Sequence, residues 1–177
     1  AGIRVFYPRF LPVPGLRGAF KPFAMAAAAI PILPKLRRSG YSFELIDAHY
    51  FFPDGVAAAL LARYFRVPFI VTARGSDLNY HAQQALPRML VKWAAKCAAA
   101  TVTVSDALRR VALQIGMQAD KVRVLRNGVD LERFRPLDRL PIRSRLGVKG
   151  LVLLSVGNLV AEKGHELTIR ALSGIPQ

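Results

Sequence analysis

Apolar residues along the chain follow two alternating patterns, one typical of strands and one typical of helices. Short runs rich in β-branched and aromatic residues predict strands over residues 3–7, 43–49, 67–72, 101–104, 120–125 and 151–156. Between these runs, apolar residues recur at helical spacing over residues 19–36, 54–65, 80–99, 106–115 and 166–172. Strands that alternate with helices in this way predict an α/β fold, a doubly wound, Rossmann-like parallel sheet.

Three residues are expected to mark helix ends. Asp54 and Ser105 each precede a helical pattern, and their side-chain oxygens can accept the first free backbone N–H groups of the helix. Gly116 follows a helical pattern and is expected to end it, because glycine readily adopts the left-handed backbone found there. We therefore predict helices that begin after Asp54 and Ser105, the second of which ends at Gly116.

The pattern over residues 80–99 predicts a long helix with one buried face. Pro87 is expected to lie near the start of its regular part. The predicted face consists of Leu86, Leu90, Trp93, Ala94 and Cys97, and the basic residues lie elsewhere. Cys97, the single cysteine of the chain, is accordingly expected to be a small buried side chain, and the chain has no internal disulfide.

The segment 19–36 is open to two interpretations. Pro31 and Pro34 are expected to break or kink its later part. Basic residues flank the segment, which is consistent with an amphipathic contact with a membrane. An ordinary packed helix with snorkelling basic side chains is the alternative, which the abundance of small alanines favours. Residues 8–15, rich in proline, are expected to form a rigid loop.

The stretch 122–172 contains a second kind of pattern. After a short strand, Asn127 and Gly128 form a pair that turns the chain sharply. The continuous apolar run 151–156 then ends at Gly157, as expected for a strand buried on both faces of a parallel sheet. A loop with Lys163 and a helix follow. A strand, a glycine-bounded loop and a helix can hold a phosphate against backbone N–H groups at the positive end of the helix.

Taken together, these residues resemble the interdomain segment of family 4 glycosyltransferases. The resemblance is carried by Asn127-Gly128-Val129-Asp130, Phe134 and Pro136, then Ser155-Val156-Gly157-Asn158-Leu159 and Glu162-Lys163-Gly164. It implies an enzyme of two Rossmann-like domains (GT-B) that transfers a sugar from a nucleotide-sugar donor to a glycan, lipid or small-molecule acceptor, with retention of configuration. It also implies a hinge at Asn127, Gly128 and Asp130.

The resemblance further implies how the chain is divided. Residues 1–135 would be part of the N-terminal acceptor domain, 136–150 the linker, and 151–177 the first strand, loop and helix of the donor domain. On this interpretation the fold is incomplete at both ends. The isolated chain would then be catalytically silent and poorly soluble, because sheet edges would be exposed.

Two groups of candidate site residues lie on the acceptor side. Arg74, Gly75, Ser76 and Asp77 follow a predicted strand and can contact an acceptor or a phosphate, since arginine binds anionic oxygens through paired donors. The alternative is a loop stabilised by an Arg74–Asp77 ion pair. Many relatives carry a histidine at the position of Arg74. The sugar-contacting role of that histidine therefore cannot be transferred directly to Arg74.

His49 is the second acceptor-side candidate. It ends a predicted strand, where α/β sheets bind ligands, and Asp47-x-His49-x-x-x-Pro53 is similar to the family pattern. The resemblance makes His49 a candidate catalytic residue, and a purely structural role is the alternative.

On the donor side, the resemblance implies that Gly157, Asn158 and Lys163 bind the nucleotide-sugar and that Lys163 contacts its diphosphate. Many relatives carry an arginine where Asn158 stands, so Lys163 is expected to supply more of the positive charge. The alternative for Lys163 is a solvated loop lysine.

The formal net charge of +15 has several possible origins. An anionic membrane face or an anionic donor fits the 26 basic and 11 acidic residues. Nucleic acid is not expected, because the arginines are spread along the chain without an aromatic-interleaved stripe or a recognition helix. A coding bias toward arginine and alanine is the remaining explanation. The single cysteine fits a reducing, cytoplasmic location, peripheral to the inner membrane face if the charge binds lipid.

Other α/β chemistries are not supported by the motifs. The sequence contains neither a Gly-x-Gly-x-x-Gly after a strand, nor a Gly-Lys-Ser/Thr loop, nor a Gly-x-Ser-x-Gly. It contains no Cys/His cluster, and neither a metal nor another cofactor is expected. The alternative function is a non-catalytic basic α/β domain that binds an anionic membrane or nucleic acid.

Overall fold

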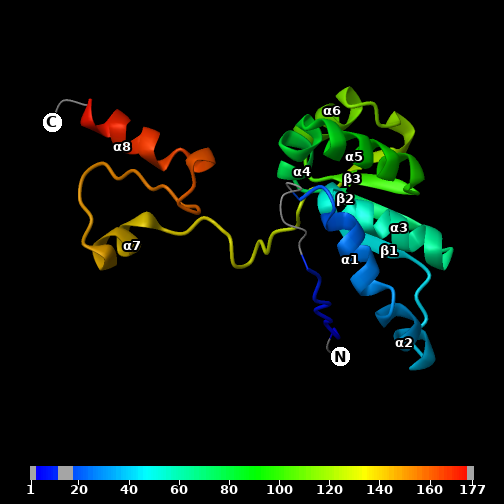
Figure 1. The fold of residues 1–177 in the computed structure, drawn as a ribbon. Coiled ribbons are helices and arrows are strands. Elements are labelled where there is room, and N and C mark those ends of the chain that lie inside the picture. The colour runs from blue at the N-terminus through cyan, green and yellow to red at the C-terminus, as the bar shows by residue number, and fades with distance from the viewer. Residues whose placement is uncertain (1–2, 12–17, 175–177) are drawn as a thin grey trace. The chain divides into compact units, whose positions relative to one another are not determined.

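The computed structural model describes residues 3–11 and 18–174. The chain forms two compact units, Ala1–Gly128 and Val129–Gln177, each of which is described by itself (Figure 1). The proline-rich loop expected over residues 8–15 lies partly outside the described residues. No helix of the described residues is long and apolar enough to cross a membrane.

The first unit is built on a parallel sheet of four strands in chain order. These strands are β1 (Ile46–His49), β2 (Phe69–Ala73), β3 (Ala100–Thr103) and β4 (Val122–Val124). All three neighbouring pairs are parallel, so the four carboxyl ends lie at one edge of the sheet. The strands predicted at 43–49, 67–72, 101–104 and 120–125 are therefore confirmed, with bounds that differ by a few residues.

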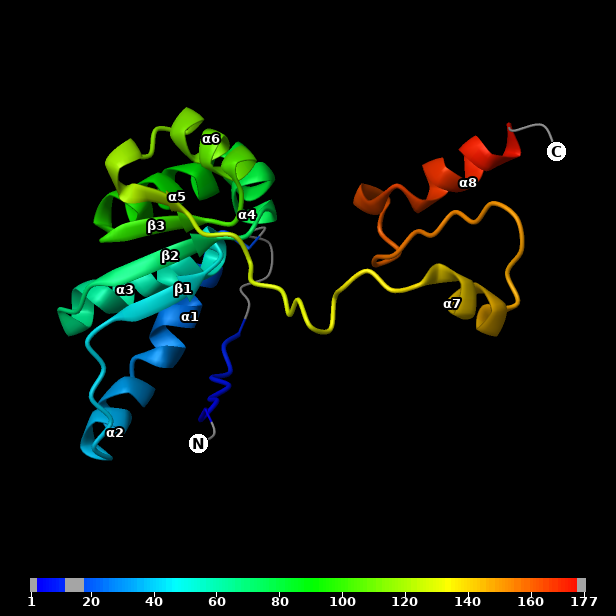
Figure 2. The same cartoon turned by 180° about the vertical axis from the view of Figure 1, so that it is seen from behind.

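Helices connect the strands and cover one face of the sheet. Figures 1 and 2, which view the sheet from opposite sides, show α3 (Val56–Phe65) and α5 (Ala85–Cys97) on the same face. The other helices of this unit are α1 (Lys21–Ala29), α2 (Ile32–Arg38), α4 (Ser76–Asn79) and α6 (Asp106–Gln114). Shorter helical turns span Phe51–Gly55, His81–Gln83 and Ala119–Lys121.

Small residues dominate the core between the helices and the sheet. Ala48, Val71, Thr101 and Val122 lie in register across the four strands, and each is less than one tenth exposed. The packing is close enough to select a glycine: a Cβ atom at Gly55 would lie 2.9 Å from Val71 Cγ2. A larger residue at Gly55 would push the start of α3 away from β2.

Several predicted helix ends are confirmed. The Ser105 hydroxyl accepts the Leu108 N–H at 3.2 Å and caps α6, and Gly116 follows that helix with a φ of 93°. Pro31 separates α1 from α2, as its missing N–H predicts. Pro87 lies in the first turn of α5, where proline is tolerated.

The predicted cap at Asp54 is wrong. Gly55, not Asp54, is the N-cap of α3 and makes no side-chain hydrogen bond, and the preceding turn is kinked at Phe52, whose backbone is extended (φ −129°, ψ 124°). Asp54 instead lies half-buried within the preceding turn, and burial raises the pKa of its carboxyl.

The buried face of the long helix is only partly as predicted: Ala94 is buried, and Leu90 and Trp93 pack against the core, partly buried. The helix begins only at Ala85, because Gln84 is extended, and its buried residues are Pro87, Val91, Ala94 and Ala95. This face is rotated by about one residue, or 100°, from the predicted one. Cys97 is exposed rather than buried. The small side chains of the true face fit the narrow space over the sheet, whereas the larger Leu86 remains exposed.

Two predicted strands are absent from the structure. Residues 3–7 and 151–156 are exposed and pair with no strand in the part of the chain that the structure describes. A strand without a hydrogen-bonding neighbour is not stable in water, so apolar character alone does not make these runs extended and buried.

Within the described residues, the second unit contains two helices, α7 and α8. Helix α7 (Arg139–Leu146) lies within the predicted linker, where the Asp138 carboxylate caps it by accepting the Leu140 N–H at 3.0 Å. Helix α8 (His165–Ser173) confirms the helix predicted over 166–172, and a short helical turn, Ala161–Lys163, precedes it.

Candidate functional site

The first candidate site lies at the carboxyl edge of the parallel sheet. His49 is the last residue of β1, and Arg74 directly follows β2. Asn127 follows β4 by three residues. Because parallel strands end at the same edge, residues far apart in sequence meet here, as expected for ligand sites of α/β sheets.

Arg74 joins the ends of β1 and β4. Its Nη1 donates to Asn127 Oδ1 at 2.8 Å, and its Nη2 donates to His49 Nδ1 at 2.8 Å. The structure thus brings together the predicted residues Arg74 and His49 and adds Asn127, which the sequence placed in a hinge. Two of the five guanidinium N–H groups are used in these contacts, so others remain able to bind an anion.

The contact with Arg74 determines the tautomer of His49. A guanidinium can only donate hydrogen bonds, so His49 Nδ1 must be the unprotonated acceptor. The proton of the neutral ring is then on Nε2, which lies 3.6 Å from Asp47 Oδ2. Asp47 and Arg74 together orient the imidazole from opposite sides.

Asp77 holds the loop that follows β2 through hydrogen bonds to its backbone. It is fully buried, and its carboxylate accepts the backbone N–H groups of Phe51 at 2.9 Å, Gly75 at 2.7 Å and Arg74 at 3.2 Å. The Arg74 guanidinium does not pair with Asp77, so the side-chain ion pair considered from the sequence is not formed. Asp77 holds the backbone that presents Arg74, and its enclosed carboxylate is not placed to touch an acceptor.

Gly75 and Ser76 complete this loop. Gly75 has a φ of 143°, a backbone conformation that favours glycine. Ser76 is exposed at the start of α4. Gly75 and Ser76 directly follow Arg74 in the sequence. Their contact with an acceptor stays a prediction.

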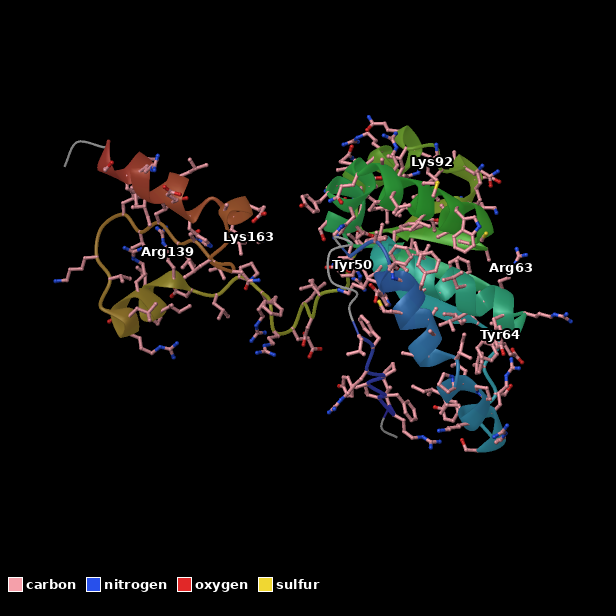
Figure 3. All side chains as sticks on the ribbon, viewed as in Figure 1. Tyr50, Arg63, Tyr64, Lys92, Arg139 and Lys163 are labelled. Atoms are coloured by element: carbon pink, nitrogen blue, oxygen red, sulfur yellow. The ribbon has the colours of Figure 1, made fainter. Side chains whose placement is uncertain are left out.

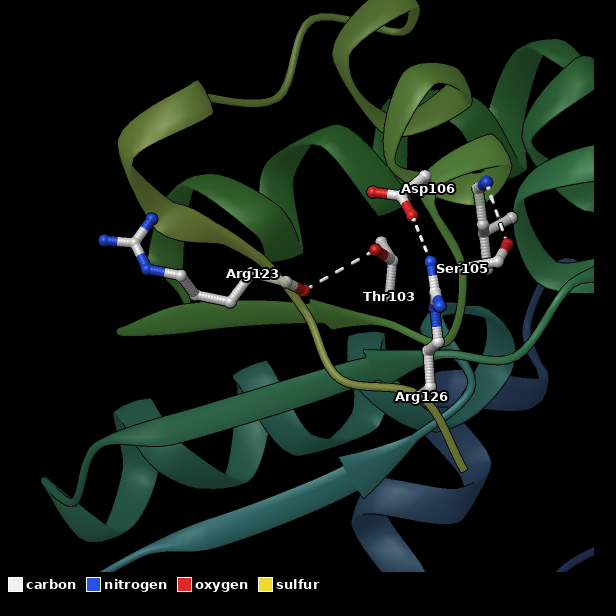
Figure 4. A network of polar contacts seen from close by, with 6 residues as sticks. Thr103, Ser105, Asp106, Arg123 and Arg126 are labelled. Atoms are coloured by element: carbon white, nitrogen blue, oxygen red, sulfur yellow. Dashed lines mark hydrogen bonds and ion pairs between the residues drawn. The ribbon is translucent and has the colours of Figure 1, made fainter. Parts of the chain in front are cut away.

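A polar network fixes the ends of β3 and β4 (Figure 4). Arg126 donates to Asp106 at 2.9 Å, which ties the end of β4 to the first turn of α6. This hydrogen bond lowers the pKa of the Asp106 carboxyl. Thr103 donates to the Arg123 carbonyl at 3.5 Å, and Ser105 caps α6. The network positions the residue that precedes Asn127.

The second candidate site lies in the other unit, around Gly157. A Cβ atom at Gly157 would lie 3.4 Å from Lys163 Cγ and Cδ and from His165 Nε2, so both side chains pass directly over the glycine. Lys163 is exposed and ends the short turn before α8 (Figure 3). The predicted donor residues Gly157, Asn158 and Lys163 are thus adjacent.

His165 was missed by the sequence reasoning. Its Nε2 lies 3.1 Å from the Asn158 carbonyl oxygen, and its Nδ1 lies 2.8 Å from Ser155 Oγ. A carbonyl can only accept, so Nε2 carries a proton. The imidazole therefore fastens both ends of the Ser155–Asn158 loop to the start of α8. The available signal was a histidine two residues after Lys163, at the first position of the helix.

The remaining predicted residues lie at the boundary between the units. Asn127 and Gly128 end the first unit. The Asp130 carboxylate accepts the N–H groups of Glu132 and Arg133, both at 3.0 Å, within a tight turn of the second unit. Their function as a hinge stays a prediction.

Residues 3–133, more than half of the chain, match the sequence profile of Glycosyltransferase Family 4. The matched region includes His49, Arg74 and Asn127, which are here called the Arg74 cluster. The chain belongs to the family 4 glycosyltransferases. The resemblance inferred from the residues 127–164 is thereby confirmed, although the matched region lies mostly before them.

Two relatives extend the similarity of this family 4 glycosyltransferase beyond the matched region. TuaC of Bacillus subtilis, named as a glycosyltransferase of teichuronic acid biosynthesis, is 31% identical over 169 residues, 92% of this chain and 42% of the relative. D-inositol 3-phosphate glycosyltransferase 1 of Catenulispora acidiphila is 32% identical over 148 residues, 77% of this chain and 35% of the relative. The chain thus spans about two fifths or less of the length of these relatives.

The fold of the family 4 glycosyltransferase has counterparts among solved structures. Anabaena Alr3699/HepE in complex with UDP-glucose matches with a TM-score of 0.66 and 22% identity, over 82% of this chain and 41% of that chain. This similarity confirms the predicted α/β, Rossmann-like fold class.

Proposed function

We propose that the protein containing this chain transfers a sugar from a nucleotide-sugar donor to a glycan, lipid or small-molecule acceptor, with retention of configuration. The observation that carries the proposal is the Arg74 guanidinium, held between His49 and Asn127 at the carboxyl edge of the sheet in a family 4 glycosyltransferase. The UDP-glucose complex of Alr3699/HepE supports a nucleotide-sugar as the donor.

The Arg74 cluster would act by holding an anionic or hydroxyl oxygen. Arg74 is exposed and retains free N–H donors, and its two contacts hold the guanidinium plane in one orientation. A charged donor fixed in advance stabilises developing negative charge without having to reorganise during the reaction. His49 accepts from Arg74 through Nδ1 and would act by holding the guanidinium in place.

Arg74→Lys tests this function. Lysine keeps the charge but cannot reach both His49 and Asn127 with one planar fork. Loss of one charge-assisted hydrogen bond of about 1.5–3 kcal/mol should lower kcat/KM about tenfold or more. The measurement is release of nucleoside diphosphate from a set of nucleotide-sugars by the full-length protein.

The matched control for Arg74→Lys is Arg66→Lys, at an exposed arginine after α3, which should retain wild-type kcat/KM. Failure of the wild-type protein to release nucleoside diphosphate from any of these donors would contradict the proposed function. A wild-type kcat/KM in Arg74→Lys would show that Arg74 is not part of the active site.

His165 is expected to position the donor loop. His165→Ala removes the contacts to Ser155 and Asn158, two neutral hydrogen bonds of about 1 kcal/mol each. The donor KM should rise about tenfold, with a smaller change in kcat. His165→Gln can still donate to the Asn158 carbonyl and should recover part of the loss. Arg170→Gln, on the exposed side of α8, is the control, and an unchanged donor KM in His165→Ala would refute the positioning role.

Three further parts of the proposal concern the surroundings of the reaction. We propose a cytoplasmic protein, which the single cysteine supports, and one that uses no metal ion and no other cofactor, since its sequence contains no Cys/His cluster. We also propose peripheral contact with an anionic membrane, supported by the net charge of +15, and no binding of nucleic acid.

A further inference from the structure

Helix α5 carries a straight row of basic residues on its outer side. Arg88, Lys92 and Lys96 are spaced four residues apart, which places them on one face of a helix, and all three are exposed. The row extends for about 12 Å along the helix axis. The sequence of α5 contains no acidic residue. The row is therefore not compensated by charges on its own helix.

Apolar side chains lie beside this basic row. Met89 is 59% exposed, and Trp93, the single tryptophan of the chain, is only partly buried. A shallow groove of about 470 Å³ is lined by Ala85, Arg88, Met89, Lys92, Trp93 and Lys96. Leu86 and Cys97 continue the apolar stripe at the surface. Apolar side chains that the sequence predicted for the core are thus presented to the outside, next to cations.

Neighbouring elements extend the positive surface. Arg63, near the end of α3, lines a second groove together with Trp93 and Cys97 (Figure 3 labels Arg63 and Lys92). The Lys121 ammonium donates to the carbonyls of Lys96 at 3.3 Å and Ala98 at 3.2 Å, which places it at the end of α5. Asp120 is its neighbour in sequence, and within residues 3–11 and 18–174 no ion pair involves any of these basic side chains.

We propose that the surface formed by Arg63, Arg88, Met89, Lys92, Trp93 and Lys96, here called the α5 surface, docks on an anionic lipid bilayer. Charge complementarity favours the bilayer, because each lysine or arginine near an anionic leaflet adds to binding. The mixture of exposed Met89 and Trp93 with long basic side chains is typical of interfacial helices, whose stems lie in the headgroup region while the charged ends remain hydrated. This proposal rests on the proposed function, and it names the surface through which the protein would contact the membrane.

The α5 surface and the Arg74 cluster belong to the same unit of the chain. Helix α5 begins at Ala85, shortly after α4, and α4 begins at the sheet edge that carries Arg74. A bilayer that contacts α5 would therefore lie against the same unit as the candidate acceptor residues. This arrangement suits an acceptor that is itself a membrane lipid.

The test is co-sedimentation of the full-length protein with vesicles of phosphatidylcholine, with and without phosphatidylglycerol. The wild type should bind only the anionic vesicles, and binding should weaken as salt is added. Replacement of Arg88, Lys92 and Lys96 by glutamine, a good helix former, should lower the vesicle partition constant roughly a hundredfold. Met89→Gln should lower it a few-fold on vesicles and leave retention on a soluble polyanion column unchanged.

The control removes the same charge from exposed arginines in and just before α7, by Arg135→Gln, Arg139→Gln and Arg145→Gln together, and should reduce the partition constant far less. Equal losses in the two triple variants would overturn the proposal, since binding would then follow net charge alone. Tighter binding of the wild type to duplex DNA or RNA than to anionic vesicles would overturn it as well.

The α5 triple variant should release nucleoside diphosphate in the presence of a water-soluble acceptor at the wild-type rate. Vesicle binding that is lost only in this variant would support the α5 surface even if the wild type transferred no sugar. Conversely, sugar transfer by a protein that ignores vesicles would leave the proposed function intact and refute the α5 surface.

Discussion

Lys163→Ala should lower the turnover of the full-length enzyme by an order of magnitude or more, with acceptor affinity nearly unchanged. During glycosyl transfer, negative charge grows on the leaving nucleoside diphosphate as the bond to the sugar breaks. A cation fixed beside those oxygens stabilises the transition state more than the ground state, and that difference raises kcat.

The structure of the second unit supports this role for Lys163. The Lys163 side chain passes directly over Gly157, so the lysine lies against the backbone of the predicted donor loop. Helix α8 begins two residues later, and the free N–H groups of its first turn add positive potential. Asn158 offers a hydrogen bond where many relatives carry a charge, so the loss of Lys163 should not be compensated.

Steady-state kinetics with varied donor and acceptor separate the possible outcomes. Lys149→Ala, at an exposed lysine of the same unit, controls for the loss of one positive charge and should retain the wild-type kcat. A Lys163→Ala enzyme with near wild-type kcat would show that Lys163 is a solvated loop residue, the alternative considered from the sequence.

Asp77→Ala should lower the stability of the first unit by at least about 3 kcal/mol. The substitution leaves three buried or partly buried backbone N–H groups, those of Phe51, Arg74 and Gly75, without their acceptor. Each such loss costs about 1–3 kcal/mol. For a domain of this size, the change corresponds to a fall in Tm of about 10 °C.

Thermal unfolding followed by circular dichroism measures this effect. Asp120→Ala removes an exposed carboxylate from the same unit and should shift Tm by little. Asp77→Asn keeps the shape but replaces one acceptor oxygen with a donor, so it should also destabilise the unit. A Tm within about 2 °C of wild type for Asp77→Ala would mean that the loop does not depend on this carboxylate.

The sequence alone determined the elements whose signals are local. Ser105 caps α6 and Gly116 ends it because capping depends on the side chain and backbone freedom of single residues. The four strands of the sheet and the helices between them followed from hydrophobic periodicity. The positions of His49 and Arg74 at strand ends followed as well, because parallel strands end at one edge.

Only the tertiary structure decided which apolar residues are covered and which polar groups meet. Residues 86, 90, 93, 94 and 97 have the helical spacing of a core face, yet only Ala94 among them is fully buried, beside Val91, which the pattern did not indicate. Leu90 and Trp93 are partly buried against the core, and Leu86 and Cys97 are exposed. Residues 151–156 are apolar but exposed, since burial requires neighbours that local pattern does not supply. The contact of Arg74 with Asn127, across 53 residues of sequence, depends on the pairing of strands. Long-range packing of this kind is set by the whole fold and by no single stretch of the chain.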